Sequence, residues 1–271
     1  MWSFSLNGAT STEVFVRKGV YMTYNWDAET YSNLDLPHQR WGEQLLSSYH
    51  FRGDEIVFGA GCGTGRDAAK LAERVPCGKV FAVDNSISML KVAERRLKEK
   101  YPNIEFCQAD LLSGLSAFEP VDLVYSVAAF HWISDHASLF RNLFEVMKSG
   151  AYLLCDCGGK GNIQEVIQAS NSVIGSSDSE RVWNFADAES TRINLEEAGF
   201  QVLEVRLERD PATFSSEDEF KSFLRTLILG DYLSKIDNED RDEFVAKVAG
   251  LIPSKTVDYV RLKIKAMVPI V

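Results

Sequence analysis

The chain has 271 residues, of which 45% are hydrophobic and 25% charged, a composition typical of a soluble globular protein with a large core. The net charge of -10 and the pI near 5.0 disfavour a broad nucleic-acid or anionic-lipid surface, because both partners would be repelled. No apolar run reaches the roughly 20 residues that span a bilayer, and the first residues lack a basic start followed by an apolar stretch. We therefore expect a cytoplasmic protein with no nucleic-acid or membrane partner.

The five cysteines are odd in number and irregularly spaced, which does not fit a disulfide framework in a chain of this size. Zinc sites need paired CxxC or Cys/His spacing, which is missing, so we expect no metal. Cys155 and Cys157 lie two positions apart in an apolar run, and we expect both on one side of a strand as core residues.

The middle of the chain alternates short apolar runs with helical stretches. Strands are expected at five places: Ile56–Phe58, Val80–Val83, Ile104–Cys107, Asp122–Ser126 and Ala151–Cys157. Helices are expected between them: Arg66–Val75, a helix capped by Ser86 and running to about Lys100, and His136–Met147. Strands with few polar residues, separated by helices, predict a parallel sheet covered on both faces. Such sheets bind ligands at the carboxyl ends of their strands.

After Gly158 the alternation of strands and helices becomes less regular. The expected elements are a helix at Ile163–Ile174, a helix at Thr191–Ala198 stopped by Gly199, a strand at Phe200–Leu207, a helix from Ser216 to Leu229 and a helix at Asp240–Ala249. In the last segment Val260, Leu262, Ile264 and Ala266 alternate with Arg261, Lys263 and Lys265, which predicts a half-exposed strand. No linker divides the chain. We expect one domain with an N-terminal lid at about 1–50, a core at about 51–158, and cap helices at about 163–185 and 216–250.

The glycine-rich stretch GAGCGTG, residues 59–65, lies between the first strand and the first helix of this sheet. A turn of this kind lets a ligand approach the backbone and directs the unpaired amides of the helix start at it. Dinucleotide-binding folds place GxGxxG here, for a pyrophosphate. Residues 61–65 read GxGxG, a tighter spacing that favours a smaller polar ligand. The alternative is a glycine-rich turn that binds nothing.

Acidic residues follow the next two strands. Asp84 lies 19 residues after Gly65 and could accept both hydroxyls of a ribose. Asp110 could accept from an adenine amino group, with the Leu111 amide available to a ring nitrogen. Each aspartate alone could equally be a helix cap or a turn residue. Three such features at the ends of three successive strands favour a nucleoside-containing ligand.

The ordered motifs GAGCGTG, FAVDNSISML, FCQADLL, DLVYSVAAFHWISDH and MKSGAYLLCDCGG resemble those of class I S-adenosylmethionine-dependent methyltransferases. YNWDAETYS, FHWISDH and CGGKGN extend the resemblance to the trans-aconitate methyltransferase-like branch, over nearly the whole chain. The resemblance implies an α/β fold with a doubly wound, seven-stranded, mostly parallel sheet whose last strand is antiparallel. It also implies S-adenosylmethionine as cofactor and S-adenosylhomocysteine as its product.

The resemblance further implies roles by position. The glycine loop would pass under the methionine and ribose, Asp84 and Asn85 would hold the ribose, and Asp110 and Leu111 the adenine. Ser126 would lie near the methionine carboxylate or the sulfonium. The implied cofactor contacts are Gly61, Cys62, Gly63, Gly65, Asp84, Asn85, Asp110, Leu111 and Ser126, and the implied lid residues are Tyr24, Trp26 and Tyr31.

The chain departs from the family pattern at Gly59, where the family usually carries an Asp or Glu that orients the glycine loop and helps hold the cofactor's amino group. Glycine cannot do this, and Asp54 and Glu55 lie at the wrong end of the strand to replace it. The departure predicts weaker cofactor binding. At the limit, it allows a protein that keeps the fold without the reaction.

The methyl acceptor must be aligned by other residues. His131, after the fourth strand, is the candidate general base for a phenol or alcohol; the alternative is a structural histidine that packs with Trp132, since a carboxylate acceptor needs no base. A small acid could be bound through its carboxylate by an arginine, and the candidates are Arg181, Arg225 and Arg261. The alternative is that these are solvated surface residues. Of these we place Arg225 with Trp132 in the substrate site. Two aromatic residues, Trp183 and Phe185, either line the substrate pocket or pack in the hydrophobic core of the cap.

Three functions are compatible with these features. The first is methylation of a small molecule, with a carboxylic acid as the expected acceptor. The second is a regulatory protein of methyltransferase fold that binds the cofactor weakly, motivated by Gly59. The third, a nicotinamide-dependent oxidoreductase, predicts GxGxxG and is disfavoured by GxGxG. The protein could be a monomer or a homodimer.

Overall fold

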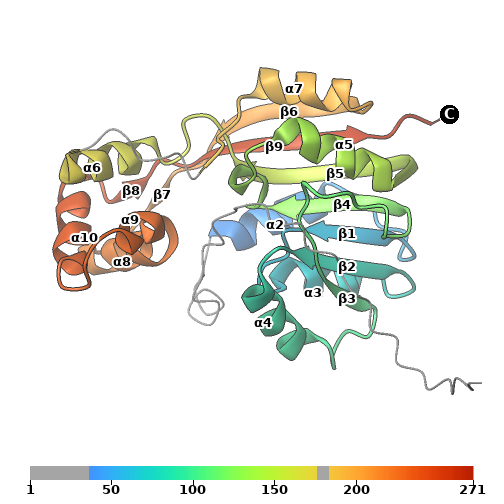
Figure 1. Ribbon diagram of the computed structural model, residues 1–271, viewed down its shortest axis with the longest axis horizontal. Helices are drawn as coiled ribbons and strands as arrows, with labels where there is room; N and C mark the ends of the chain where they lie inside the picture. Colours follow the sequence, from blue (N-terminus) through green and yellow to red (C-terminus); the bar gives the residue numbers. More distant parts are fainter. Residues whose placement is uncertain (1–36, 176–182, 271) are drawn as a thin grey trace, which may run out of the picture.

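The computed structural model describes residues 37–175 and 183–270 and contains a seven-stranded sheet in the order β3-β2-β1-β4-β5-β9-β6 (Figure 1). Its strands are β1 (Ile56–Ala60), β2 (Lys79–Asp84), β3 (Ile104–Gln108), β4 (Val121–Val127), β5 (Met147–Gly158), β6 (Gln201–Arg209) and β9 (Val260–Met267). β1 to β5 are parallel, whereas β9 is antiparallel to both β5 and β6. The predicted fold class, including the antiparallel last strand, is confirmed.

Helices cover both faces of the sheet. The described helices are α2 (Pro37–Ser47), α3 (Arg66–Arg74), α4 (Ile87–Leu97), α5 (His136–Val146), α6 (Gln164–Ile174), α7 (Ala188–Glu197), α8 (Glu217–Phe223), α9 (Gly230–Ser234) and α10 (Arg241–Gly250). Side chains of α2 and α3 form one hydrophobic cluster with one face of the sheet, and α5 and α7 form another with the opposite face. Ser86 caps α4 through the Met89 amide, as its sequence position predicts.

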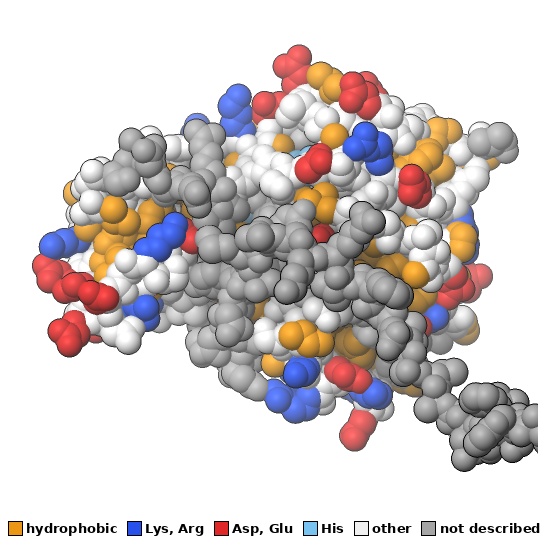
Figure 2. Space-filling view, viewed as in Figure 1, with side chains coloured by type: hydrophobic (Ala, Val, Ile, Leu, Met, Phe, Trp, Pro, Cys, Tyr) orange, Lys and Arg blue, Asp and Glu red, His pale blue; other side chains and the backbone are white. Residues whose placement is uncertain are grey.

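A third hydrophobic cluster lies beyond the carboxyl ends of the parallel strands, where α6, α8, α9 and α10 pack together (Figure 1). Figure 2 shows both acidic and basic side chains on the exposed surface of this group of helices. A two-stranded sheet of β7 (Ala212–Thr213) and β8 (Thr256–Val257) lies on the path between this cluster and the main sheet.

The helix expected from Ser216 to Leu229 changes its hydrogen bonding part-way. Helix α8 ends at Phe223 and is followed by the π-helical segment η2 (Leu224–Ile228). Widened turns of this type occur often at functional sites.

Strand β9 differs from its prediction at one residue. Lys263 and Lys265 are half-buried in the alternating pattern, but Arg261 is only 1% exposed. Its Nε donates to Asp156 Oδ1 on β5 at 2.8 Å, and its guanidinium lies 3.7 Å from the ring centre of Trp41. The alternative of a solvated Arg261 was therefore wrong, because this side chain is buried and paired inside the protein.

None of the helices in residues 37–175 and 183–270 is long and apolar enough to cross a bilayer. Within the same residues no group of three or more His, Cys, Asp or Glu side chains is arranged to hold a metal ion.

Candidate functional site

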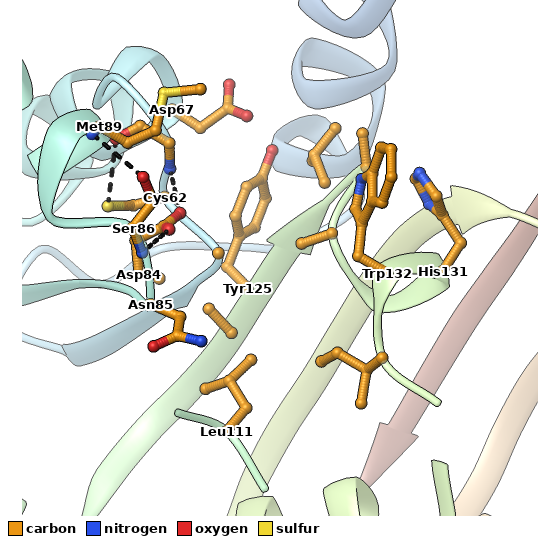
Figure 3. Close-up of a pocket in the computed structure, with 18 of the residues that line it drawn as sticks. Cys62, Asp67, Asp84, Asn85, Ser86, Met89, Leu111, Tyr125, His131 and Trp132 are labelled. Atoms are coloured by element: carbon orange, nitrogen blue, oxygen red, sulfur yellow. Dashed lines mark hydrogen bonds between the residues drawn. The ribbon is translucent and has the colours of Figure 1, made fainter. Parts of the chain in front are cut away.

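A cavity of about 560 Å³ opens at the carboxyl ends of β1, β2 and β4 (Figure 3). One part of its wall comes from the loops that follow β1, β2 and β3, and the other from residues after β4, from the start of α6, from η2 and from β9. This is the edge at which the alternation of strands and helices predicts a ligand. Most of the sequence-predicted cofactor positions line the cavity: Gly61, Cys62, Gly63, Asp84, Asn85, Asp110 and Leu111.

The glycine loop needs its glycines for two physical reasons. Gly61, Gly63 and Gly65 all have positive φ, which side chains rarely adopt. A Cβ on Gly61 would also lie 2.3 Å from the Cβ of Ala129, in the loop after β4. The Gly61 and Cys62 amides donate to Val83 O, which fixes the loop against the end of β2. Gly65 lies directly before α3, inside the wall rather than at the cavity surface.

Asp84 ties the glycine loop to the next helix. Its Oδ2 accepts from the Gly63 amide and its Oδ1 from the Ser86 amide, both at 2.8 Å. Burial raises the pKa of this carboxyl, although its backbone hydrogen bonds oppose the rise. A carboxylate offers about four acceptor positions, so two backbone bonds leave capacity for the hydroxyls of a ligand. Asp84 therefore both orders the loop and presents acceptors to the cavity.

Asp110 is a turn residue as well as a cavity residue. Its Oδ1 accepts from the Leu112 amide at 2.9 Å, so Asp110 is a local turn residue, one of the two roles that the sequence allowed. The same residue and Leu111 also line the cavity. Met89 and Leu111 add apolar surface near this end, which suits a flat ring.

His131 lies in the short 3-10 helix η1 (Phe130–Trp132) after β4, at the opposite end of the cavity from Asp84 (Figure 3). Its Nδ1 is 3.1 Å from the Gly158 amide nitrogen. A backbone N–H can only donate, so Nδ1 accepts and the proton of the neutral ring is on Nε2. In this arrangement Nε2 carries the proton and has no lone pair to accept another. The geometry therefore favours the structural histidine, the alternative that the sequence left open.

Ser126 does not lie where the resemblance places it. Its side chain is buried, and its hydroxyl donates to Ala60 O at 2.8 Å. Side chains alternate along a strand, and it is Tyr125 and Val127 that line the cavity. Ser126 thus joins β4 to β1 and does not line the cavity.

Arg225 is also displaced from its predicted role. It lies on the exposed side of η2, where its guanidinium forms an ion pair with Asp242 on α10. Leu227 and Ile228 are the η2 residues that reach the cavity. The π-helical turn therefore directs apolar side chains inward and leaves the arginine outside.

Aromatic side chains form the wall around His131. Trp183 and Phe185 are stacked with ring centres 5.8 Å apart, and Trp132 lies 5.9 Å from Trp183. Trp132, Trp183 and Phe185 all line the cavity, and Trp183 and Phe185 also pack against the hydrophobic cluster of the cap helices. The predicted lid residues Tyr24, Trp26 and Tyr31, and the candidate Arg181, lie outside the described residues.

Sequence reasoning missed Asp67. This residue is in the first turn of α3, lines the cavity, and has a buried Oδ1 atom with no hydrogen-bond partner among the described residues. Burial raises the pKa of its carboxyl to about 6. The signal was present in the sequence, because an aspartate one helical turn before Leu71 lies on the apolar face of α3. An acid on that face is easily taken for an ordinary residue of the first turn.

Asp67 makes stability depend on pH. The pKa of this carboxyl is about 6 in the folded protein and about 3.8 in the unfolded chain. Its ionisation therefore does not affect the free energy of unfolding well below pH 3.8, and lowers that free energy increasingly as the pH rises to 6. We expect Asp67→Asn to raise the free energy of unfolding at pH 7 by at most about 3 kcal/mol, and to leave it unchanged near pH 3.5. Urea denaturation at the two pH values measures this, and an equal effect at both would contradict the assignment.

Two non-glycine residues with positive φ also line the cavity, Ala128 (φ 56°) and Ile163 (φ 50°). Backbone strain of this kind tends to gather at ligand sites, where the surrounding structure holds it in place. Ala128 follows β4, and its amide donates to Asp156 O on β5. The turn that places Ala129 against Gly61 is thus held by the neighbouring strand.

Comparison with known proteins agrees with this geometry. Residues 57–150, which contain the glycine loop, Asp84 and Asp110, match the family described as methyltransferase domain. These residues form a methyltransferase domain. The resemblance to class I methyltransferases drawn from the motifs is therefore confirmed.

A trans-aconitate 2-methyltransferase from Azoarcus sp. (strain BH72) is 34% identical to the chain over 128 residues, which cover 47% of this chain and 49% of that protein. The chain spans about half the length of the curated relatives it matches.

Solved structures share the fold over more of the chain. The YcgJ protein from Bacillus subtilis has a TM-score of 0.61 and 16% identity, covering 86% of this chain and 99% of that chain. A phosphoethanolamine N-methyltransferase 2 from Haemonchus contortus, solved in complex with S-adenosyl-L-methionine, has a TM-score of 0.55 and 21% identity, covering 85% of this chain and 52% of that chain. At these identities the likeness is one of fold.

Proposed function

We propose that this protein binds S-adenosylmethionine in the cavity and transfers its methyl group to a small molecule. The observation that carries the proposal is the arrangement of Asp84, Asp110 and the glycine loop around one cavity, within a methyltransferase domain. Asp84 retains acceptor capacity for the two ribose hydroxyls. Met89 and Leu111 supply apolar surface for adenine. S-adenosylmethionine supplies a methyl group that is already activated by the sulfonium.

The wall beyond the glycine loop suits an acceptor with an apolar body. It contains Trp132, Trp183, Phe185, Leu227 and Ile228. Within the described residues, the buried cation of this wall, Arg261, is already paired with Asp156. A compact acid with several charges would have to bring its carboxylates against these aromatic rings, which is unfavourable without paired cations.

The acceptor group we propose is a carboxylate. Nδ1 of His131 accepts from Gly158, so this ring donates from Nε2 and cannot remove a proton from an alcohol or phenol. A carboxylate is ionised at neutral pH and needs no base. His131 would then orient it by donating a hydrogen bond. An apolar carboxylic acid suits the aromatic and aliphatic wall and needs no base.

We propose that the helices at about 163–185 and 216–250 form a cap, within a single domain. Of the segment at about 1–50 that was expected to form a lid, Pro37–Ser47 form α2, which packs against the sheet. The packing of α6, α8, α9 and α10 around their own hydrophobic cluster supports the cap. The cap would help to exclude water from the acceptor site.

Calorimetric titration of S-adenosylmethionine and S-adenosylhomocysteine into the purified protein tests the first step. We expect binding at about micromolar strength, or roughly -8 kcal/mol. A screen of carboxylic acids, phenols and amines, with mass-spectrometric detection of methyl esters and other methylated products, tests the second. No binding of either compound would overturn the proposal, and turnover restricted to phenols or amines would overturn the acceptor class.

Two substitutions at His131 separate a hydrogen-bond donor from a base. The amide nitrogen of His131→Gln can reach the position of Nε2, whereas His131→Asn replaces only the Nδ1 acceptor. If the ring donates, we expect Gln to keep at least about ten times more turnover of the acid acceptor than Asn, or about 1.4 kcal/mol of barrier. Equal loss in both variants, with unchanged cofactor affinity, would contradict the donor role.

A further inference from the structure

The cavity wall contains an acidic group whose inner oxygen has no partner among the described residues. Oδ1 of Asp67 is buried without a hydrogen bond, a costly arrangement for a group that ionises near neutral pH. Arg66 and Lys70 lie on the same helix, and both favour the ionised form. Lys70, however, is paired with Glu43 at 2.9 Å, and Glu43 opposes the ionised form of Asp67.

Asp67 lies on α3, the helix that a side chain at residue 59 would face. A Cβ added to Gly59 would be 3.9 Å from Leu71 Cδ1, so it would face α3. Asp67 precedes Leu71 by one turn, so the two residues share a face of that helix. Tyr125 pairs with Gly59 in the neighbouring strand and lines the same part of the cavity. Asp67, Tyr125 and a side chain at residue 59 would thus lie on the same side of the sheet, beside the same cavity.

The surroundings of the carboxylate are fixed by neighbouring backbone. The Tyr125 hydroxyl donates to Gly42 O at 2.9 Å, and a Cβ on Gly42 would lie 2.7 Å from Asp67 Oδ1. Helix α2 therefore approaches the carboxylate closely on one side. Figure 3 shows the Asp67 and Tyr125 oxygens near each other, at the end of the cavity away from His131.

The ligand of the proposed function carries the group that this site lacks. The methionine part of S-adenosylmethionine ends in an ammonium group that can donate three hydrogen bonds. We propose that Asp67 holds this ammonium group, and so replaces the acid that Gly59 cannot supply. The inference rests on the proposed function, because it assigns one contact of the same ligand.

A pair of ligands isolates this contact. S-adenosylhomocysteine carries the amino-acid end, whereas 5′-methylthioadenosine has the same nucleoside without it. We expect Asp67→Asn to weaken S-adenosylhomocysteine binding at least about 30-fold by calorimetry at about pH 7.5, and to change 5′-methylthioadenosine binding less than about threefold. Asp54→Asn is the matched control, because it removes one exposed carboxylate that does not line the cavity and should change neither.

The outcomes are distinguishable. Binding of S-adenosylhomocysteine to the wild type that Asp67→Asn leaves unchanged would overturn the role of Asp67 and leave the proposed function standing. Equal loss of both ligands would overturn it as well, since the nucleoside does not carry the ammonium. No binding of either ligand to the wild type would overturn the proposed function and this inference with it. Asn is isosteric with Asp, so folding should be preserved.

The pH dependence gives a second readout. With a pKa of about 6 in the free protein, the ratio of S-adenosylhomocysteine to 5′-methylthioadenosine affinity should rise about tenfold from about pH 5 to pH 7.5 and then level off. Taking the ratio removes the titration of Asp84, which faces the nucleoside in both ligands. The other charged groups whose electrostatic influence reaches Asp67 are Arg66, Lys70 and Glu43. A ratio independent of pH in the wild type would overturn an ionic contact.

Discussion

Gly61→Ala should lower the free energy of unfolding by about 3 kcal/mol and weaken S-adenosylhomocysteine binding at least about tenfold. Two costs add: a left-handed backbone conformation costs about 1–2 kcal/mol for a residue with a side chain, and overpacking typically about 1–3 kcal/mol. The second arises because the new Cβ would lie 2.3 Å from the Cβ of Ala129. The loop must move to relieve this contact, and its movement disturbs the part of the cavity nearest to it.

Gly63→Ala is the matched control. Gly63 also has positive φ, but an added Cβ would meet no atom of the described residues within 4 Å. Only the backbone cost of about 1 kcal/mol then remains. Urea denaturation of the two variants compares them directly. Equal destabilisation would show that the contact with Ala129 relaxes without cost.

The second large effect is expected at the buried ion pair of β5 and β9. Removing one partner, by Arg261→Met or Asp156→Leu, should cost about 3–5 kcal/mol, because it leaves the other charge buried and unpaired. The double variant should recover most of this loss, since burial of two apolar groups carries no charge penalty. Chemical denaturation of the two single variants and the double variant gives the coupling energy.

An exposed pair supplies the comparison. Lys98 and Glu94 form an exposed ion pair one helical turn apart at the end of α4, and removing one partner should destabilise the protein far less than removing one partner of the buried pair. If the double variant at Arg261 and Asp156 were no more stable than either single variant, the ion pair would not be the source of the effect. The Arg261 contact with Trp41 would then be the next cause to test.

The parts of the fold that the sequence predicts well are those with local causes. Apolar runs located the parallel strands to within one or two residues for most of them, and Ser86 marked the start of α4. The turn after β1 could be predicted because a backbone with positive φ favours glycine over other residues. Asp84 could be predicted to line a ligand site because it follows a buried strand at the same edge of the sheet as the glycine loop. These features depend on neighbours in the chain.

The features that were missed depend on residues distant in the chain. Arg261 has the pattern of a half-exposed strand, and only Asp156, more than a hundred positions earlier, makes it a buried residue. Ser126 was assigned by its place at the end of the strand, but its face of the sheet depends on which neighbours of β4 point into the cavity. The role of His131 required its partner at Gly158. Spacing alone carries no information on such contacts.

The position of β9 in the sheet has a consequence for the order in which the protein can fold. β6 has no neighbour in the main sheet except β9, and β9 lies between β5 and β6 although it comes last among the described strands. During synthesis, β1 to β5 can pair as soon as they emerge, but β6 must wait until about sixty further residues have been made. Until then the Asp156 carboxylate near the end of β5 has no guanidinium beside it, and the edge of β5 is open. This interval is the stage at which we expect the nascent chain to depend most on chaperones, and pairing of such distant segments to limit its folding rate.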